Sequence, residues 1–382
     1  MSCIRSFPLH FQEAQRYNAR RWPDRGAREI LPPCSSPPRS SKETANKNRT
    51  WSGPIRPGGA PGKGNVMSSL LKRLNGKGVL AVLAALFWVL ASGWAAAAEP
   101  ASQRPFGIAL IGDPHLPGNN LPVKEELLRT VDAWSDIDRV VVLGDICSQT
   151  GTAAEYAFAK EFFERLHKPT RFIVGNHDYI YEDNLDGVGK KVRASPAVRR
   201  EKLARFAETF GMKDIYGAEG QGNYLLVYLS PDDLEGNRLT QLSEGQLDWL
   251  AKELAAHKDL PTIVFFHAPL DGTLKSYNEH ANTPSFIAQP AVRLKELIRE
   301  NPQLFLWVAG HMHVPATNES YSSPVNLYEK QVTVIHNADL ERKRPWTNVL
   351  YLYPDRVVVR TYDHGQKTWR ADLERLVRPP GL

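Results

Sequence analysis

Five apolar runs of the sequence are each followed, within a few residues, by aspartate, asparagine or histidine. In chain order, the residues at these points are Asp113 and His115; Asp145; Asn176, His177 and Asp178; His267; and His311 and His313. Buried parallel strands read as continuous apolar runs, and ligands bind at the edge onto which their carboxyl ends open. The pattern therefore predicts a sheet whose strand ends gather these side chains into one site.

A glycine immediately precedes four of the five groups, at positions 112, 144, 175 and 310. Because glycine lacks a Cβ, it permits tight turns and a close approach of backbone to a neighbouring group. We therefore expect crowded turns at these strand ends.

The remaining periodicity predicts an α/β fold. Expected strands cover residues 106–111, 139–143, 171–174, 224–229, 262–266, 304–308, 331–335, 349–353 and 356–361. Expected helices cover residues 122–135, 152–167, 196–210, 243–257 and 291–300. Strands that alternate with helices of about 10–15 residues are typical of βαβ units, and the strand-rich C-terminal third indicates a second or mixed sheet. Ser243 with Gln246 predicts a capping box at the fourth helix.

The N-terminal quarter differs from the rest of the chain. Residues 1–66 are rich in Pro, Arg, Ser and Gly without a sustained apolar period, so we interpret them as a disordered leader upstream of a true start at Met67. Residues 67–98 combine basic residues, an apolar run and a small-residue end, the pattern of a secretory signal peptide. This pattern predicts a periplasmic or secreted domain at residues 99–382. If the segment stays uncleaved, it predicts a membrane anchor with the domain outside.

The net charge of +6 belongs to this N-terminal region. Residues 1–98 hold 15 Lys and Arg against 4 Asp and Glu, which leaves 33 basic and 38 acidic side chains for residues 99–382. A uniformly basic surface is therefore not expected, and nor is a nucleic-acid partner. The three cysteines predict no disulfide framework.

Carboxylates, an amide oxygen and imidazoles are ligands that suit borderline divalent metals such as Mn, Fe, Zn or Ni. Seven candidates exceed what one catalytic ion with an open position takes, but they fit two ions if Asp145 bridges them. Two cations about 3.5–4 Å apart can clamp a phosphoryl group and generate hydroxide near neutral pH. The candidate metal ligands are Asp113, His115, Asp145, Asn176, His267, His311 and His313.

The ordered motifs Asp-x-His, Gly-Asp, Gly-Asn-His-Asp, His and Gly-His-x-His resemble those of the calcineurin-like metallophosphoesterases. They cover residues 113–313. Residues 243–250 and Phe-Phe-His267-Ala-Pro look like the class III cyclic-nucleotide phosphodiesterase branch. The resemblance implies a two-sheet β-sandwich flanked by helices.

The same resemblance implies roles for individual residues. Asp113, His115, Asp145 and His313 would hold the first metal. Asp145, Asn176, His267 and His311 would hold the second. His177 would be the catalytic acid that protonates the leaving oxygen, and Asp178 would orient it.

The leading functional hypothesis is therefore a dinuclear-metal-dependent hydrolase of phosphodiesters or phosphomonoesters, with a metal-bridging hydroxide as nucleophile. Its substrate would be a phosphorylated small molecule or lipid, selected by the loops at residues 179–195 and 270–289. The alternative is a non-catalytic protein on the same fold that binds a phosphorylated ligand or scaffolds a partner. Intact His177 and Asp178 argue against that alternative.

Three further features have weaker interpretations. Cys147 is expected to be a packed thiol rather than a ligand. His336 follows a strand and could line the cleft. The basic stretch at residues 190–200 is expected to be a solvated face, although it could border the site and attract an anionic substrate.

Overall fold

The computed structural model describes residues 104–185, 187–275 and 277–381. The predicted leader, signal peptide and start at Met67 lie outside the described residues. Within the described part of the chain, no helix has the length and apolar character needed to cross a membrane.

The first sheet mixes parallel and antiparallel strands in the order β14-β13-β12-β1-β2-β3, with β15 also paired to β13. Its parallel strands are β1 (Phe106–Ile111), β2 (Arg139–Val142) and β3 (Thr170–Phe172). The antiparallel part consists of β12 (Trp346–Tyr353), β13 (Arg356–Asp363), β14 (Thr368–Trp369) and β15 (Arg375–Val377). Strands β1 and β2 are largely apolar and buried, and the carboxyl ends of the three parallel strands share one edge.

The second sheet has the order β10-β11-β9-β8-β7-β6. Its parallel centre is formed by β7 (Tyr224–Tyr228), β8 (Thr262–Phe265), β9 (Leu304–Ala309) and β11 (Val332–His336). Its edges are β6 (Gly217–Gln221) and β10 (Leu327–Tyr328), both antiparallel to their neighbours. A separate hairpin pairs β4 (Tyr181–Leu185) with β5 (Lys191–Arg193).

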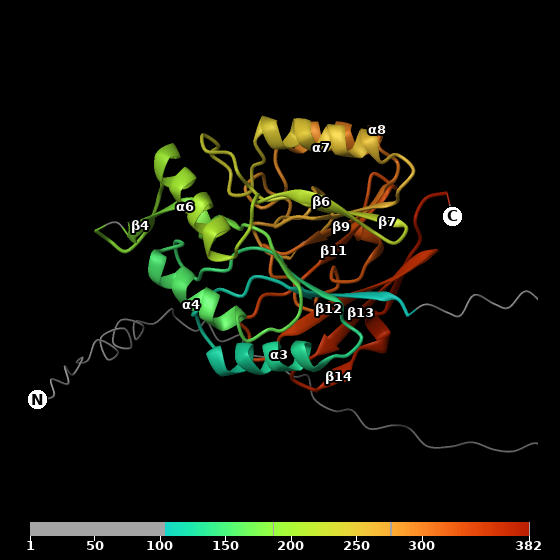
Figure 1. Ribbon diagram of the computed structural model, residues 1–382, viewed down its shortest axis with the longest axis horizontal. Coiled ribbons are helices and arrows are strands. Elements are labelled where there is room, and N and C mark those ends of the chain that lie inside the picture. The colour runs from blue at the N-terminus through green and yellow to red at the C-terminus, as the bar shows by residue number, and fades with distance from the viewer. Residues whose placement is uncertain (1–103, 186, 276, 382) are drawn as a thin grey trace, which may run out of the picture. The chain divides into compact units, whose positions relative to one another are not determined.

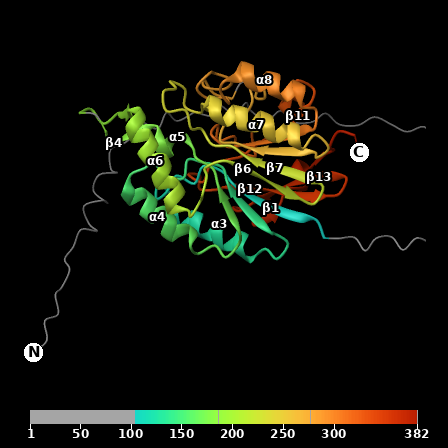
Figure 2. The ribbon, with the colours of Figure 1, turned by 45° about the horizontal axis from the view of Figure 1, so that its top comes forward.

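The two sheets pack face to face between two layers of helices. On the first sheet lie α3 (Leu121–Ala133), α4 (Ala153–Phe163) and α6 (Pro196–Thr209); on the second lie α7 (Glu244–Ala256) and α8 (Ala291–Glu300). Figures 1 and 2 show α7 and α8 on the side of the domain opposite α3 and α4. Alternate residues of β1 divide between two cores: Ile108 and Leu110 pack between the sheets, whereas Ala109 and Ile111 pack toward the helices. The predicted α/β sandwich flanked by helices is confirmed.

The predicted elements match the observed ones apart from shifts of a few residues at their ends. The prediction lacked the β4–β5 hairpin, the short helix α5 (Asn176–Tyr179), β6 and the short strands β10, β14 and β15. Strand β6 lies at the edge of the sheet and is only partly buried. Its sequence Gly-Ala-Glu-Gly-Gln carries no apolar alternation from which a strand could be predicted.

The capping box predicted at α7 is half wrong. The Ser243 hydroxyl accepts a hydrogen bond from the Gln246 backbone N–H at 3.2 Å, as expected. The Gln246 side chain does not return the bond; it pairs with the backbone of Ser230 through both its oxygen and its nitrogen. The Ser243 N–H instead donates to Asp232.

Candidate metal centre

The candidate ligands extend from the carboxyl ends of strands in both sheets. The first sheet supplies Asp113, His115, Asp145 and Asn176, and the second supplies His267, His311 and His313. The structure brings all seven predicted side chains to one edge of the sandwich, in two overlapping groups. Asp145 belongs to both groups.

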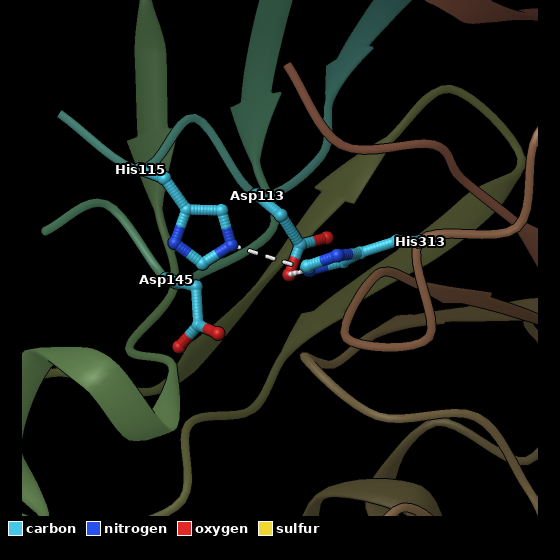
Figure 3. A group of neighbouring side chains, drawn as sticks. All are labelled: Asp113, His115, Asp145 and His313. Atoms are coloured by element: carbon cyan, nitrogen blue, oxygen red, sulfur yellow. Dashed lines mark hydrogen bonds and ion pairs between the residues drawn. The ribbon is translucent and has the colours of Figure 1, made fainter. Parts of the chain in front are cut away.

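The first group contains Asp113, His115, Asp145 and His313, each of which offers one ligand atom within 4.8 Å of the others. The Nε2 atom of His313 lies 3.2 Å from His115 Nε2 and 3.3 Å from Asp113 Oδ1. Figure 3 shows the His115 ring facing His313, with the Asp113 carboxylate beside them. Two imidazole nitrogens and a carboxylate oxygen thus point into one small space.

The second group contains Asp145, His267 and His311. The Nε2 atom of His267 lies 3.4 Å from Asp145 Oδ1 and 3.3 Å from the amide oxygen of Asn176, which adds a fourth donor. The His311 Nε2 lies 3.2 Å from the carbonyl oxygen of Ser285, so a proton there leaves Nδ1 free for a ligand.

Several candidate ligands have backbone conformations in the left-handed region, which is unfavourable for non-glycine residues. Positive φ angles occur at five candidate ligands: Asp113 (39°), His115 (45°), Asp145 (49°), His311 (62°) and His313 (51°). These five make up half of the ten non-glycine residues with positive φ in the described chain. Such strain clusters at functional sites, where the surrounding structure holds it in place.

Two of the predicted glycines are required for the ligands to approach the backbone. A Cβ on Gly175 would overlap the backbone nitrogen and Oδ1 of Asp145, and one on Gly310 would overlap Oδ2 of Asp113. The glycines are therefore present at these positions because the carboxylates of Asp145 and Asp113 pack directly against the backbone.

The carboxylates of the site raise the pKa of two of its histidines. Burial opposes protonation of His267, but the carboxylates of Asp145 and Asp113 outweigh it and raise its pKa to about 9. Burial likewise opposes protonation of His313, and Asp113 and Asp339 help to raise its pKa to about 9. Bound cations would take over the balancing role of these protons. The donor set and its charge therefore fit a pair of divalent metal ions.

His177 lies beside this centre with one ring nitrogen fixed. Its Nδ1–H donates to the carbonyl oxygen of Ser148 at 3.0 Å, so Nε2 faces Asp145 Oδ2 at 4.0 Å. Its backbone N–H donates to the other Asp145 oxygen at 2.8 Å.

The expectation that Asp178 orients the His177 ring is wrong. The Asp178 carboxylate accepts hydrogen bonds from the backbone N–H groups of Gly175 at 2.7 Å and Cys147 at 2.9 Å. Burial and the negative charge of Asp145 raise its pKa to about 7. Asp178 thus connects the loops that follow β2 and β3. The His177 ring is instead oriented by the backbone carbonyl of Ser148.

Two further side chains reach the site, of which Asp339 was absent from the prediction and Lys191 belongs to the predicted basic stretch. Asp339 Oδ2 lies 3.7 Å from His313 Nδ1, and its residue follows β11 as the other acidic groups follow their strands, so the same signal could have found it. Lys191 lies against His177, and of the predicted basic stretch it is this residue that borders the site. Arg199 of the same stretch is buried and donates to three backbone carbonyls.

The remaining candidates are structural. Cys147 is fully buried in the core between the first sheet and its helices, as predicted, and burial raises the pKa of its thiol well above the usual range. His336 is also fully buried; its Nε2 donates to the carbonyl of Thr273, and burial lowers its pKa to about 4.

The fold, the candidate ligands and similar proteins together define a metal-dependent phosphoesterase, a hydrolase of phosphoric ester bonds. The chain belongs to the calcineurin-like phosphoesterase family, whose sequence model matches residues 106–315. The family predicted from the five motifs is confirmed.

Individual relatives are distant in sequence. The chain is 24% identical over 288 residues to a 3′,5′-cyclic-nucleotide phosphodiesterase of Nostoc, an alignment that covers 71% of this chain and 93% of the relative. It is 27% identical over 178 residues to a glycerophosphodiester phosphodiesterase of Enterobacter lignolyticus, covering 46% of this chain and 56% of the relative. The structure of a dimetal phosphatase from Danio rerio covers 72% of this chain and 99% of its own, at 16% identity and a TM-score of 0.49.

Proposed function

We propose that the protein hydrolyses small phosphodiesters at a dinuclear metal centre. The observation that carries the proposal is the pair of overlapping ligand groups that share Asp145, with His177 beside them. The choice of diesters over monoesters is supported by the names of the two relatives, a cyclic-nucleotide and a glycerophosphodiester phosphodiesterase.

We assign the first metal to Asp113, His115, Asp145 and His313, and the second to Asp145, Asn176, His267 and His311. Two divalent ions held there would neutralise phosphoryl charge and lower the pKa of water. Mn, Fe, Zn and Ni all suit this mixture of oxygen and nitrogen donors. The backbone N–H groups of His311 and His177 donate to the carboxylates of Asp113 and Asp145 and help to hold these donors in place.

His177 is assigned the proton transfer to the leaving oxygen. The Ser148 carbonyl fixes the Nδ1–H and therefore leaves Nε2 as the nitrogen that faces the centre. A general acid must lie within hydrogen-bond reach of the atom it protonates, and Nε2 is the ring atom directed toward Asp145. Asp178 is assigned a positioning role, because it holds the loop that carries Asn176 and His177.

The test is an assay of the full chain, loaded with Mn²⁺ or Zn²⁺, on bis(p-nitrophenyl) phosphate and p-nitrophenyl phosphate. Cyclic AMP and a glycerophosphodiester complete the panel. We expect metal-dependent turnover that is faster on diesters than on monoesters. A chain that binds two metals and hydrolyses none of these compounds would refute the proposed function.

His177→Ala should lower kcat by about 10²–10⁴-fold, because it removes the proton donor. Metal content, measured by mass spectrometry, should stay close to that of the unaltered protein, since His177 is assigned no metal. His167→Ala removes an exposed histidine that pairs with Asp132 and serves as the matched control. Loss of both metals in His177→Ala would contradict the assigned role.

We also propose that residues 67–98 direct export of the domain at residues 99–382. The basic, apolar and small-residue order of that segment supports the proposal. N-terminal sequencing of the protein from fractionated cells tests it: a mature start near Glu99 outside the cytoplasm is expected, and an intact segment in the cytoplasm would overturn it.

A further inference from the structure

The hairpin β4–β5 brings a lysine to the general-acid candidate. The hairpin projects from the body beside α6 (Figures 1 and 2). The Lys191 Nζ lies 3.1 Å from His177 Nδ1 and 3.3 Å from His177 Nε2. The ammonium therefore lies within hydrogen-bond distance of the ring whose Nε2 is assigned the proton transfer.

Among the described residues, Lys191 forms no ion pair with a carboxylate, and two carboxylates act on its pKa from a greater distance. These are Asp145 and Glu155, and both are engaged elsewhere. Glu155 accepts hydrogen bonds from the backbone N–H groups of residues 149–152, and Asp145 lies among its histidine partners. Burial lowers the pKa of Lys191, and Asp145 and Glu155 offset this effect only in part.

Its position is nevertheless well defined. Tyr181, on the partner strand of the hairpin, places its ring centroid 5.4 Å from Nζ, a distance at which a cation is attracted to the ring face. The Tyr181 ring also packs edge-on against the His177 ring, with centroids 5.9 Å apart. The ammonium is therefore held between two rings at the border of the metal centre.

We propose that Lys191 binds an anionic phosphoryl oxygen of the substrate beside His177. The inference rests on the proposed function, since it places the leaving oxygen at His177 Nε2. A phosphoryl group close enough to receive a proton from Nε2 comes within reach of Nζ, which lies 3.3 Å from the same nitrogen. An ammonium is a strong donor to phosphate oxygens, and an anionic oxygen is a favourable partner for its charge.

The arrangement has a consequence for substrate class. A phosphomonoester dianion gains more from a single extra cation than a diester monoanion does, because the attraction scales with charge. Lys191 should therefore increase activity on monoesters more than on diesters, and its removal should raise the preference for diesters.

The experiment compares Lys191→Met, which keeps the length of the side chain and removes its charge, with the unaltered full chain loaded with Mn²⁺. Titration calorimetry with inorganic phosphate should show a Kd weakened by about ten- to a hundredfold, the value of one charged hydrogen bond. KM should rise with it, and kcat/KM should fall more for p-nitrophenyl phosphate than for bis(p-nitrophenyl) phosphate. Lys191→Arg should restore most of the phosphate affinity.

Lys190→Met is the matched control, because it removes the same charge from the adjacent residue of the hairpin. Unchanged phosphate affinity in Lys191→Met would overturn the proposal, and so would an equal loss in Lys190→Met. If Lys191→Met unfolds at a lower temperature than the unaltered protein, Lys191→Gln replaces it in the same titration. An unaltered protein that binds phosphate but hydrolyses no ester would refute the proposed function and leave the assignment of Lys191 standing.

Discussion

The residue types at the site serve the backbone as well as the metals. Asp, Asn and His are the non-glycine residues that enter positive φ most readily, because their short polar side chains tolerate the left-handed region. Asp113, His115 and Asp145 all adopt it. Each such residue costs about 1–3 kcal/mol, which the surrounding contacts must offset. Coordination and turn geometry therefore favour the same residue types at these strand ends.

Gly175→Ala should empty the metal centre. Gly175 has a negative φ, so alanine is not excluded by its backbone conformation. The added Cβ would overlap backbone and side-chain atoms of Asp145, the residue shared by both ligand groups. We expect loss of bound metal and of turnover, measured by mass spectrometry and by the diester assay. Gly220→Ala, where a Cβ meets nothing within 4 Å, should retain both.

The sequence predicted which side chains meet but not every partner within the site. Strand-end motifs are local, so Asp113, Asp145 and their companions could be read from the chain. The orienting group of His177 is a backbone carbonyl, at Ser148, and a carbonyl has no residue type to recognise. The position of Lys191 beside His177 depends on the β4–β5 hairpin, whose strands carry no apolar alternation and were therefore not predicted.

At the scale of elements, the sequence predicted the strands that are buried on both faces. The central strands β1, β2, β8 and β9 are buried along almost their whole length, and their continuous apolar runs marked them in the sequence. The edge strand β6 and the hairpin strands lack that burial and therefore lacked the signal.

Ser230 ties the two sheets together and gives a prediction about stability. Its hydroxyl accepts from the N–H of Val174, after β3, and donates to the carbonyl of Ile215. Ser230→Ala would leave both backbone groups without this partner in the interior, at a cost of about 1–3 kcal/mol in the free energy of unfolding. Urea denaturation measures the change. Ser243→Ala, which removes an N-cap, should cost about 1 kcal/mol, and a smaller loss in Ser230→Ala than in Ser243→Ala would refute the argument.

At the scale of the whole molecule, the centre depends on both sheets. The first sheet brings both carboxylates, the Asn176 amide and the His115 imidazole, and the second brings three imidazoles. Each ligand group also contains a histidine of the second sheet and is complete only when the sandwich is assembled, so metal binding should stabilise the folded state at the expense of the unfolded one.

Divalent metal should raise Tm, and EDTA should reverse the rise. A ligand at about 100 times its Kd adds about 2.7 kcal/mol per site. The shift should grow as the pH is raised toward 9, because His267 and His313, each with a pKa of about 9 in the metal-free protein, must release protons to bind. Scanning calorimetry at several pH values measures it. A shift that shrinks over this range would contradict the assignment of these histidines.

The two loops predicted to select the substrate are attached to the centre differently. Residues 270–289 contact the second-sheet ligands, because Ser285 accepts from His311 and the Phe286 ring stacks on it. The β4–β5 hairpin contacts His177, which is assigned no metal. Substitutions in the hairpin could therefore change substrate specificity during evolution without loss of the bound metals. Substitutions in residues 270–289 would also disturb His311, a proposed metal ligand, and so would lower catalytic activity.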